Sequence, residues 1–157
     1  MGASKNLYRV YNYSMNKEKF VLIALRLVMG FIFLWAFLDK VFGLGFATLP
    51  EKAWIRGGSP TSGFLANAVQ GPFASVFHSL AGVAVIDWLF MLGLLFVGVT
   101  LIFNKYVKWG SVVGILMMAL IYLALLFPQN NPLIDAHIVY ILVLTLIYLK
   151  NRSDISS

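Results

Sequence analysis

Apolar residues along this chain form four runs, each long enough to cross a lipid bilayer as a helix. The runs cover Phe20–Phe42, Ile86–Phe103, Val107–Phe127 and Pro132–Leu149. An α-helix rises about 1.5 Å per residue and the hydrocarbon core of a bilayer is roughly 30 Å thick, so each run spans the core, the shortest only just. The pattern predicts an all-α, integral membrane four-helix bundle over residues 20–149, with tails at 1–19 and 150–157.

The segment between the first two runs, residues 43–85, is too long to be a structureless loop in so small a protein. PEKAWIR predicts one or two helical turns that place Lys52 and Arg56 at positions i and i+4, and GGSPTSG predicts a glycine-rich turn. GFLANAVQGPFASVFHSL predicts two short helices that lie at the membrane interface and break at Gly71–Pro72. We expect this segment to cover one end of the bundle.

The net charge of +6 is distributed in a way that indicates membrane orientation rather than nucleic-acid binding. Basic residues precede the first run, separate the second from the third and follow the fourth, at Lys5, Arg9, Lys17, Lys19, Lys105, Lys108, Lys150 and Arg152. Four spans put these segments on one side, and their excess of positive charge predicts that this side is cytoplasmic. Both termini are therefore expected on the cytoplasmic side of the cell membrane, and residues 43–85 on the outer side. Arg26 is expected to extend toward the cytoplasmic headgroups.

Composition narrows the possible chemistry. Hydrophobic residues make up 61% of the 157 residues and charged residues 11%, which argues against a soluble fold. The chain has no cysteine, and this excludes disulfides, thiolate metal sites and iron–sulfur clusters bound by its own thiolates. No haem-attachment or flavin motif is recognised in the sequence.

Glycines within the runs predict close helix contacts, at Gly30, Gly93, Gly98, Gly110 and Gly114. The PQNN turn predicts that the third and fourth helices are adjacent and antiparallel, and Asn131–Pro132 predicts the N-cap and first residue of the fourth helix. Asp135 and His137 then lie two residues apart in that helix, about 200° around its axis, which argues against a shared metal ion. No metal site is predicted.

Ionisable residues gather at the end of the bundle next to residues 43–85, at Asp39, Lys40, Lys52, Arg56, His78, Asp87, Asp135 and His137. Charged groups at membrane depth cost several kcal/mol unless they are paired or hydrated, so we expect a polar pocket there. Structural explanations stay open for several of them. A helix dipole stabilises an aspartate near a helix N-terminus, Lys40 could pair with Asp39 or Asp87, and His78 could be a packed surface residue.

KAWIRGGSPTSGF is the pattern most suggestive of ligand binding. Lys52 and Arg56 are followed by a flexible turn that includes Ser59, and then by the start of a helix near Ser62. Guanidinium groups and backbone N–H groups at a helix N-terminus bind small oxyanions. The pattern predicts an anion site in this part of the chain.

Five stretches of the chain together resemble a known family. They are RLVMGFIFLWAFLDKVFGLGF, EKAWIRGGSPTSGFL, GPFASVFHSLAG, DWLFMLGLL and NNPLIDAHIVYILVL, and they resemble the DoxX/DoxD family of small four-span membrane proteins over residues 20–149. The resemblance implies a membrane oxidoreductase subunit, similar to the large subunit of thiosulfate dehydrogenase (quinone). That enzyme oxidises thiosulfate to tetrathionate and passes electrons to membrane quinone, and it has a second, small subunit.

The candidate residues are compatible with this activity. Lys40, Lys52, Arg56, Ser59 and His78 would bind an anionic substrate, and Asp39, Asp87, Asp135 and His137 would exchange protons as quinone is reduced. Quinone would be a diffusible co-substrate, and the partners would be lipid and a small subunit or a further copy of the chain. An alternative is a non-catalytic scaffold or accessory subunit of a redox or stress-response complex.

Overall fold

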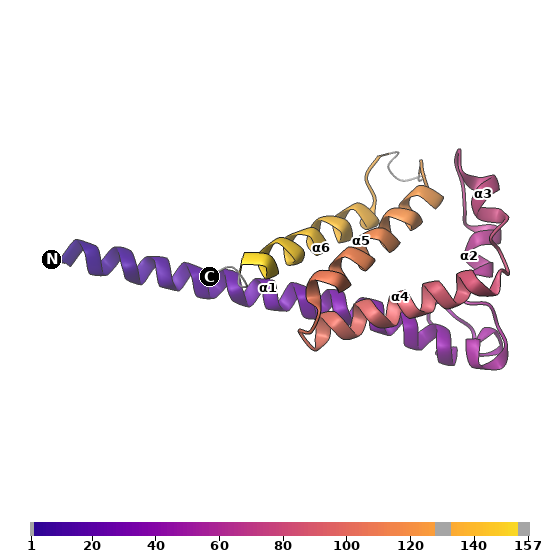
Figure 1. Ribbon diagram of the computed structural model, residues 1–157, viewed down its shortest axis with the longest axis horizontal. Helices are drawn as coiled ribbons and strands as arrows, with labels where there is room; N and C mark the ends of the chain where they lie inside the picture. Colours follow the sequence, from indigo (N-terminus) through magenta and orange to yellow (C-terminus); the bar gives the residue numbers. More distant parts are fainter. Residues whose placement is uncertain (1, 128–132, 154–157) are drawn as a thin grey trace.

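The computed structural model describes the backbone of residues 2–127 and 133–153, and the side chains of residues 17–127 and 133–151. All regular structure in these ranges is helical (Figure 1), which confirms the predicted all-α fold. The long helices are α1 (Gly2–Phe42), α4 (Ala84–Ile102), α5 (Val107–Ala124) and α6 (Ala136–Ser153). Between α1 and α4 lie the 3₁₀ turns η1 (Pro50–Lys52) and η2 (Trp54–Arg56) and the helices α2 (Ser62–Asn67) and α3 (Ala74–His78).

Three helices are long and apolar enough to cross a membrane, namely Lys17–Phe42 of α1, α4 and α5. The apolar part of α6, Ala136–Asn151, is shorter. The predicted N-cap at Asn131–Pro132 lies outside the described residues. The predicted start of the fourth helix at Pro132 is nevertheless wrong, because residues 133–135 are not helical and Asp135 itself accepts the first N–H groups of α6.

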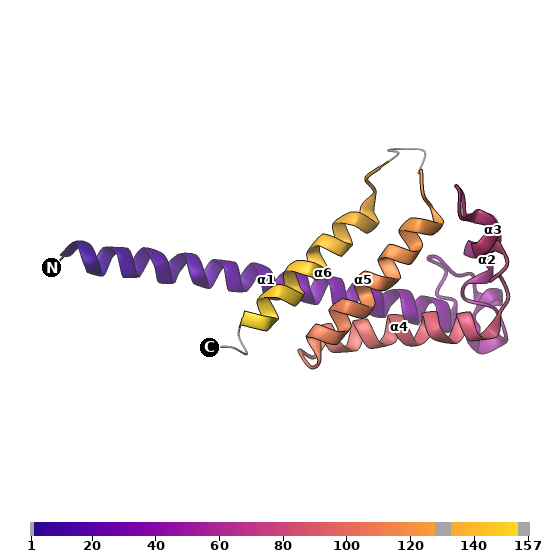
Figure 2. The ribbon, with the colours of Figure 1, turned by 45° about the horizontal axis from the view of Figure 1, so that its top comes forward.

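α1 extends further toward the N-terminus than the predicted first span. It begins at Gly2 rather than at Phe20, and its first part projects beyond the other helices (Figures 1 and 2). The N-terminal segment predicted as a tail is therefore the beginning of one continuous helix.

The long helices pack as two antiparallel pairs, α1 with α4 and α5 with α6. α4 and α5 are close at the turn that joins them and diverge toward the other end of the molecule, where α2 and α3 lie (Figures 1 and 2). The adjacency of α5 and α6 confirms the predicted neighbours. The divergence of α4 from α5 leaves a space between them at the end where α2 and α3 lie.

Two glycines set the close approach of α1 to α4, as their sequence positions predicted. A Cβ atom added at Gly98 would lie 2.8 Å from the backbone nitrogen of Leu34, and one added at Gly30 would lie 2.8 Å from Cγ1 of Ile102. A Cβ atom essentially never lies within 3.0 Å of a non-bonded heavy atom. At Gly98 the close contact is with backbone, so a larger residue there would force the helices apart, whereas at Gly30 the side chain of Ile102 would have to move as well.

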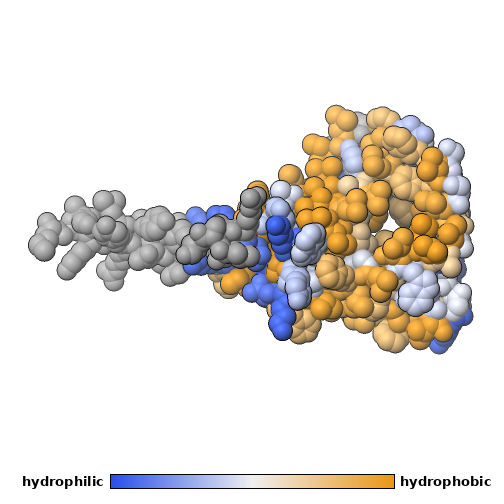
Figure 3. Space-filling view, in the orientation of Figure 1, coloured by the Kyte–Doolittle hydropathy of each residue, from blue (hydrophilic) through white to orange (hydrophobic). Residues whose placement is uncertain are grey.

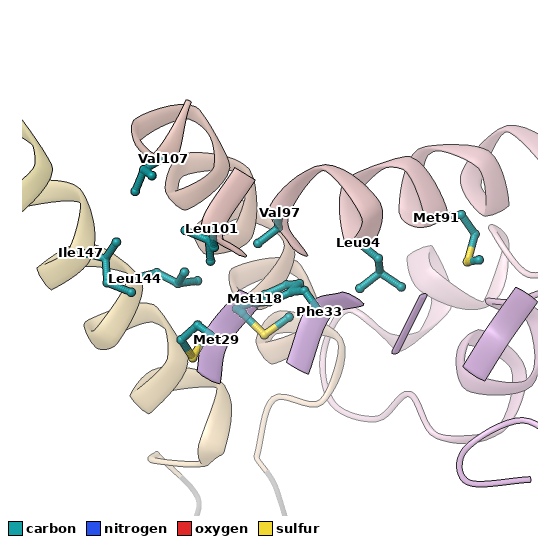
Figure 4. Close-up of a cluster of buried hydrophobic side chains, with 10 residues drawn as sticks. All are labelled: Met29, Phe33, Met91, Leu94, Val97, Leu101, Val107, Met118, Leu144 and Ile147. Atoms are coloured by element: carbon teal, nitrogen blue, oxygen red, sulfur yellow. The ribbon is translucent and has the colours of Figure 1, made fainter. Parts of the chain in front are cut away.

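A continuous apolar core joins the four long helices (Figure 4). Each helix contributes to it, through Met29, Phe33, Met91, Leu94, Val97, Leu101, Val107, Met118, Leu144 and Ile147. The outer faces of the helices are also apolar: Figure 3 shows an orange surface over most of the body, and Phe31, Leu89 and Leu142 are each more than half exposed. Helices that are apolar on both their inner and outer faces indicate a membrane protein.

Residues 43–83, called the cap below, connect α1 to α4 at the divergent end of the bundle. The predicted glycine-rich turn and the two short helices on either side of Gly71–Pro72 are confirmed. PEKAWIR forms two 3₁₀ turns rather than one helix, because the buried Ala53 between them is extended, with φ −56° and ψ 137°. The predicted i, i+4 relation of Lys52 and Arg56 on one helix is therefore wrong.

Candidate functional site

Asp39 lies in the last turn of α1 and is almost fully buried. Its Oδ1 accepts a hydrogen bond from the backbone N–H of Phe46 at 3.2 Å, and its Oδ2 accepts one from that of Ala47 at 3.0 Å. A carboxylate at a helix C-terminus is disfavoured by the helix dipole, and the two N–H donors offset this cost. Asp39 therefore fixes the first loop of the cap onto α1.

Asp87 lies in the first turn of α4 and is also buried. One carboxylate oxygen, Oδ1, accepts three hydrogen bonds: from Ser59 Oγ at 2.9 Å, from Thr61 N–H at 3.1 Å and from Thr61 Oγ1 at 2.6 Å. The position near a helix N-terminus adds a favourable interaction with the dipole. Asp87 therefore holds the glycine-rich turn of the cap against α4.

Four backbone N–H groups of the glycine-rich turn have acceptors within the protein. The N–H groups of Gly57 and Gly58 donate to backbone carbonyls, that of Thr61 donates to Asp87, and that of Ser62 donates to Ser59 Oγ at 3.1 Å. This local bonding closes the turn and starts α2. It leaves these four donors occupied, and the predicted anion site in this part of the chain stays a prediction.

Lys52 and Arg56 are the two cations of the cap, and both are exposed. Each belongs to its own 3₁₀ turn, so each contacts water on the outer surface of the cap. An anion site here would depend on these two side chains, and their predicted role in substrate binding stays a prediction.

His78 connects the two short helices of the cap. Its Nδ1 lies 2.8 Å from the carbonyl oxygen of Leu65, so the ring donates from Nδ1 and joins α3 to α2. Leu65 packs with Val69 and with Ala124 of α5 in a small second core. This contact fits the structural role that the sequence allows for His78, and its role in substrate binding stays a prediction.

Asp135 and His137 meet directly, although their spacing on an ideal helix predicted that they point apart. Asp135 precedes α6 as its N-cap: Oδ1 accepts from the N–H of His137 at 2.9 Å, and Oδ2 lies 2.6 Å from His137 Nδ1. Burial raises the pKa of the Asp135 carboxyl, but the hydrogen bonds and charge of His137 outweigh burial and hold this pKa below its usual value. The pair forms a carboxylate–imidazole unit at the start of α6.

A cavity of about 620 Å³ lies beneath the cap, in the space where α4 and α5 diverge. Its walls are almost entirely apolar, and the cap, α4 and α5 supply most of them. Residues with large side chains in this lining are Phe64, Leu65, Phe77, Leu80, Ile86, Leu89, Phe90, Leu116, Met117, Leu120 and Ile121. The predicted polar pocket is therefore wrong in character, because the space under the cap is a hydrophobic one.

Lys40 is the one charged residue in the wall of this cavity. Its Nζ lies 5.9 Å from the centre of the Phe90 ring, and no carboxylate within 4.0 Å pairs with it in the described part of the chain. Neighbouring Asp39 is occupied by backbone donors, and Asp87 by Ser59 and Thr61. The half-buried ammonium of Lys40 thus faces an apolar space, and its described partners are the Phe90 ring and, at longer range, the charge of Asp39.

The cavity opens sideways rather than only toward the cap. Leu89 of α4 and Leu116 and Leu120 of α5 line it, and these residues are also 63%, 59% and 47% exposed. Residues that form a cavity wall and the outer surface together mark its opening, and Figure 3 shows a hollow in the orange face of the body. A ligand dissolved in the surrounding lipid would enter here.

Sequence reasoning missed Thr61, which both binds Asp87 and lines the cavity, and Phe90, which lies beneath Lys40. A threonine directly after a proline in a segment of small polar residues gave a weak signal for Thr61. No sequence signal separated Phe90 from the other core aromatics. Of the nine predicted site residues, Lys40 alone lines the cavity, and no group of three His, Asp or Glu residues in the described ranges is close enough to hold a metal.

Comparisons of this chain with protein-family models, with curated proteins and with solved structures found no match.

Proposed function

We propose that the cavity beneath the cap binds the polar head of a lipophilic membrane molecule of the quinone class. The observation behind the proposal is Lys40, an ammonium group in an otherwise apolar cavity, with no carboxylate of the described residues within 4.0 Å of it. A half-buried cation in such surroundings is costly unless something with a partial or full negative charge lies opposite it. The carbonyl oxygens of a quinone are acceptors of this kind, and its ring and isoprenoid tail suit the apolar walls and the opening between α4 and α5.

The same cavity argues against a free inorganic anion as its occupant. A dianion such as thiosulfate would lose its hydration on entering apolar walls and would gain one ammonium in return, which does not repay the desolvation. The two cap cations, Lys52 and Arg56, lie in water and suit such an anion better. Any thiosulfate site therefore belongs on the outer surface of the cap.

The proposal places the protein in the cell membrane with four spans, both termini inside and the cap outside. The distribution of lysine and arginine supports this orientation. α6 is the shortest apolar helix, and local thinning of the bilayer or tilting of its neighbours accommodates such a mismatch at modest cost.

The finer proposal is a membrane oxidoreductase subunit that oxidises thiosulfate with quinone, and it rests on the resemblance to the DoxX/DoxD family. Two thiosulfate ions would each lose one electron and join through a new S–S bond to give tetrathionate. Quinone would take up the two electrons and two protons to give quinol. Asp135 and His137 do not line the cavity, so the protons would come from the aqueous side of the cap.

Replacing Lys40 by Met tests the proposal, because it removes the ammonium and keeps a long apolar side chain. We expect the affinity for decylubiquinone to fall by about 10- to 100-fold, since a hydrogen bond from a charged donor is worth roughly 1.5–3 kcal/mol. The affinity is measured on purified protein in detergent by quenching of tryptophan fluorescence, to which Trp54 and Trp88 near the cap contribute. An unchanged affinity in the Lys40→Met protein would contradict the proposal.

The control is Lys52→Met, which removes an exposed cation of the cap and should leave quinone affinity unchanged. The finer proposal has its own variant in the same experiment. The Lys52→Ala, Arg56→Ala double variant should bind quinone normally but lose reduction of quinone by added thiosulfate, followed by absorbance. Quinone binding without any thiosulfate-dependent reduction would reject the enzymatic part and keep the cavity assignment.

One observation favours the alternative of a non-catalytic scaffold or accessory subunit. The buried aspartates and His78 each make hydrogen bonds that join segments of the fold, so the chemistry-bearing residues of the cap end already serve its structure. A scaffold predicts quinone or lipid binding without turnover, and co-purification with another membrane protein under mild extraction.

A further inference from the structure

A second cavity, of about 340 Å³, lies at the opposite end of the bundle from the cap. It is formed where α1 passes α6 and the turn between α4 and α5. The lining consists of three cations, two asparagines and four aliphatic residues: Lys19, Arg26, Lys150, Asn104, Asn151, Leu22, Ile23, Val107 and Ile147. No carboxylate among the described residues lines it, so the cavity is strongly electropositive.

Arg26 is the best-fixed cation of this cavity. Its Nη1 donates to the carbonyl oxygen of Leu101 at 2.7 Å. Leu101 is in the last turn of α4, where carbonyl groups lack helical partners and the helix dipole favours a cation. The bond anchors the guanidinium at the end of α4, and it uses one of five N–H donors. The remaining donors are available to a ligand at the cavity.

The lining has an amphipathic arrangement that follows from helix geometry. Lys19, Leu22, Ile23 and Arg26 lie at positions i, i+3, i+4 and i+7 of α1 and therefore share one face. α6 shows the same spacing, with Ile147, Lys150 and Asn151 at positions i, i+3 and i+4. Cationic and amide groups thus alternate with aliphatic groups on both walls.

We propose that this cavity binds a phosphate group, that of an anionic phospholipid whose acyl chains run along the aliphatic residues. A guanidinium, two ammonium groups and amide N–H donors suit phosphate oxygens, and the aliphatic residues between them suit the glycerol and upper acyl region. Figure 3 shows hydrophilic surface gathered where α1 leaves the apolar body, at the level where lipid headgroups would lie. This inference is independent of the quinone proposal, because the two cavities share no lining residue.

The experiment uses the full-length protein in detergent, with phosphatidylglycerol, phosphatidylcholine and inorganic phosphate as separate probes, and native mass spectrometry as the readout. We expect retention of phosphatidylglycerol over phosphatidylcholine by about fivefold or more. Arg26→Gln should lower phosphatidylglycerol retention by about tenfold. Because Arg26 also binds α4, a second variant, Lys19→Gln with Lys150→Gln, leaves that bond intact and should lower retention similarly.

Lys105→Gln with Lys108→Gln is the control, because it removes two charges from the same end of the bundle outside the cavity lining. It should retain phosphatidylglycerol as the unchanged protein does. Failure of millimolar inorganic phosphate to displace the lipid identifies a phospholipid as the source of the phosphate, whereas displacement identifies a soluble phosphate at the same site. The inference would be overturned if the control lost as much phosphatidylglycerol retention as the cavity variants do. It would also be overturned if neither cavity variant lost retention.

Discussion

Replacing Asp87 by Ala is expected to lower the free energy of unfolding by about 3 kcal/mol and to release the cap from α4, because each buried donor left without an acceptor costs about 1–3 kcal/mol. The Asp87 carboxylate accepts from both the N–H and the Oγ1 of Thr61, which is buried, and from Ser59 Oγ. Thr61 is only 5% exposed, so its donors gain little from water after the substitution. Denaturant titration in mixed micelles, followed by circular dichroism, measures the change.

Two further variants show whether the effect comes from these hydrogen bonds. Asp87→Asn keeps one acceptor oxygen and should cost less than Asp87→Ala. Glu51→Ala removes an exposed carboxylate from the same cap and should change the free energy of unfolding by no more than about 0.5 kcal/mol. Limited proteolysis should cleave within residues 57–62 faster in Asp87→Ala alone. An Asp87→Ala protein as stable as the Glu51→Ala protein would mean that Asp87 does not hold the cap.

Gly98→Ala is expected to lower the free energy of unfolding by about 2 kcal/mol through overpacking between α1 and α4. The added Cβ would meet the nitrogen of Leu34 at 2.8 Å and the Cα of Leu34 at 3.0 Å. These are backbone atoms, so the contact cannot be relieved by a change of rotamer and the helices must separate. The loss should exceed the helix-propensity gain of about 1 kcal/mol that alanine brings over glycine.

Gly63→Ala provides the matched control for Gly98→Ala. Gly63 is also helical, in α2, and a Cβ added there would meet nothing within 4 Å. We expect no loss of stability, or a gain of up to about 1 kcal/mol. Both variants are measured in the same mixed-micelle titration, and equal effects of the two would contradict the tight α1–α4 contact.

Hydropathy predicted the helices well because a bilayer leaves the backbone few alternatives to a helix in an apolar run. Gly30 and Gly98 also predicted close packing, since glycine has no side chain and lets two helix backbones come into close contact. The start of α6 was missed because Pro132 and Asn131 are good helix-start residues in isolation. Asp135, four residues from Asn131, is the residue that caps this helix in the structure.

The gathering of charged groups at one end of the bundle was visible in the sequence, but the partners of those groups were not. Asp39 is bound by backbone donors seven and eight residues further along the chain, and Asp87 by backbone and hydroxyl donors more than 25 residues before it; a linear pattern gives no sign of such contacts. The cavity escaped prediction for a related reason. Its walls are leucine, phenylalanine and isoleucine, which look like ordinary packing residues until the divergence of α4 from α5 leaves them without a partner.

The two aspartates and Lys40 thus have different parts at the same end of the molecule. Asp39 and Asp87 position the cap, and the cap together with α4 and α5 encloses an apolar space. No carboxylate in the described part of the chain lies within 4.0 Å of the Lys40 ammonium, and Lys40 lines that space. A lipophilic acceptor molecule is the occupant that this arrangement favours.

Photolabelling with a tritiated azido-quinone in native membranes, followed by peptide mapping, locates the occupant itself. We predict label that is competed by unlabelled quinone and confined to residues 40, 60–65, 77–80, 86–93 and 113–124, which border the cavity, with much less label in the Lys40→Met protein. Competed label confined to α6 or to the first part of α1, or label that unlabelled quinone does not reduce, would contradict the assignment of this cavity to a quinone.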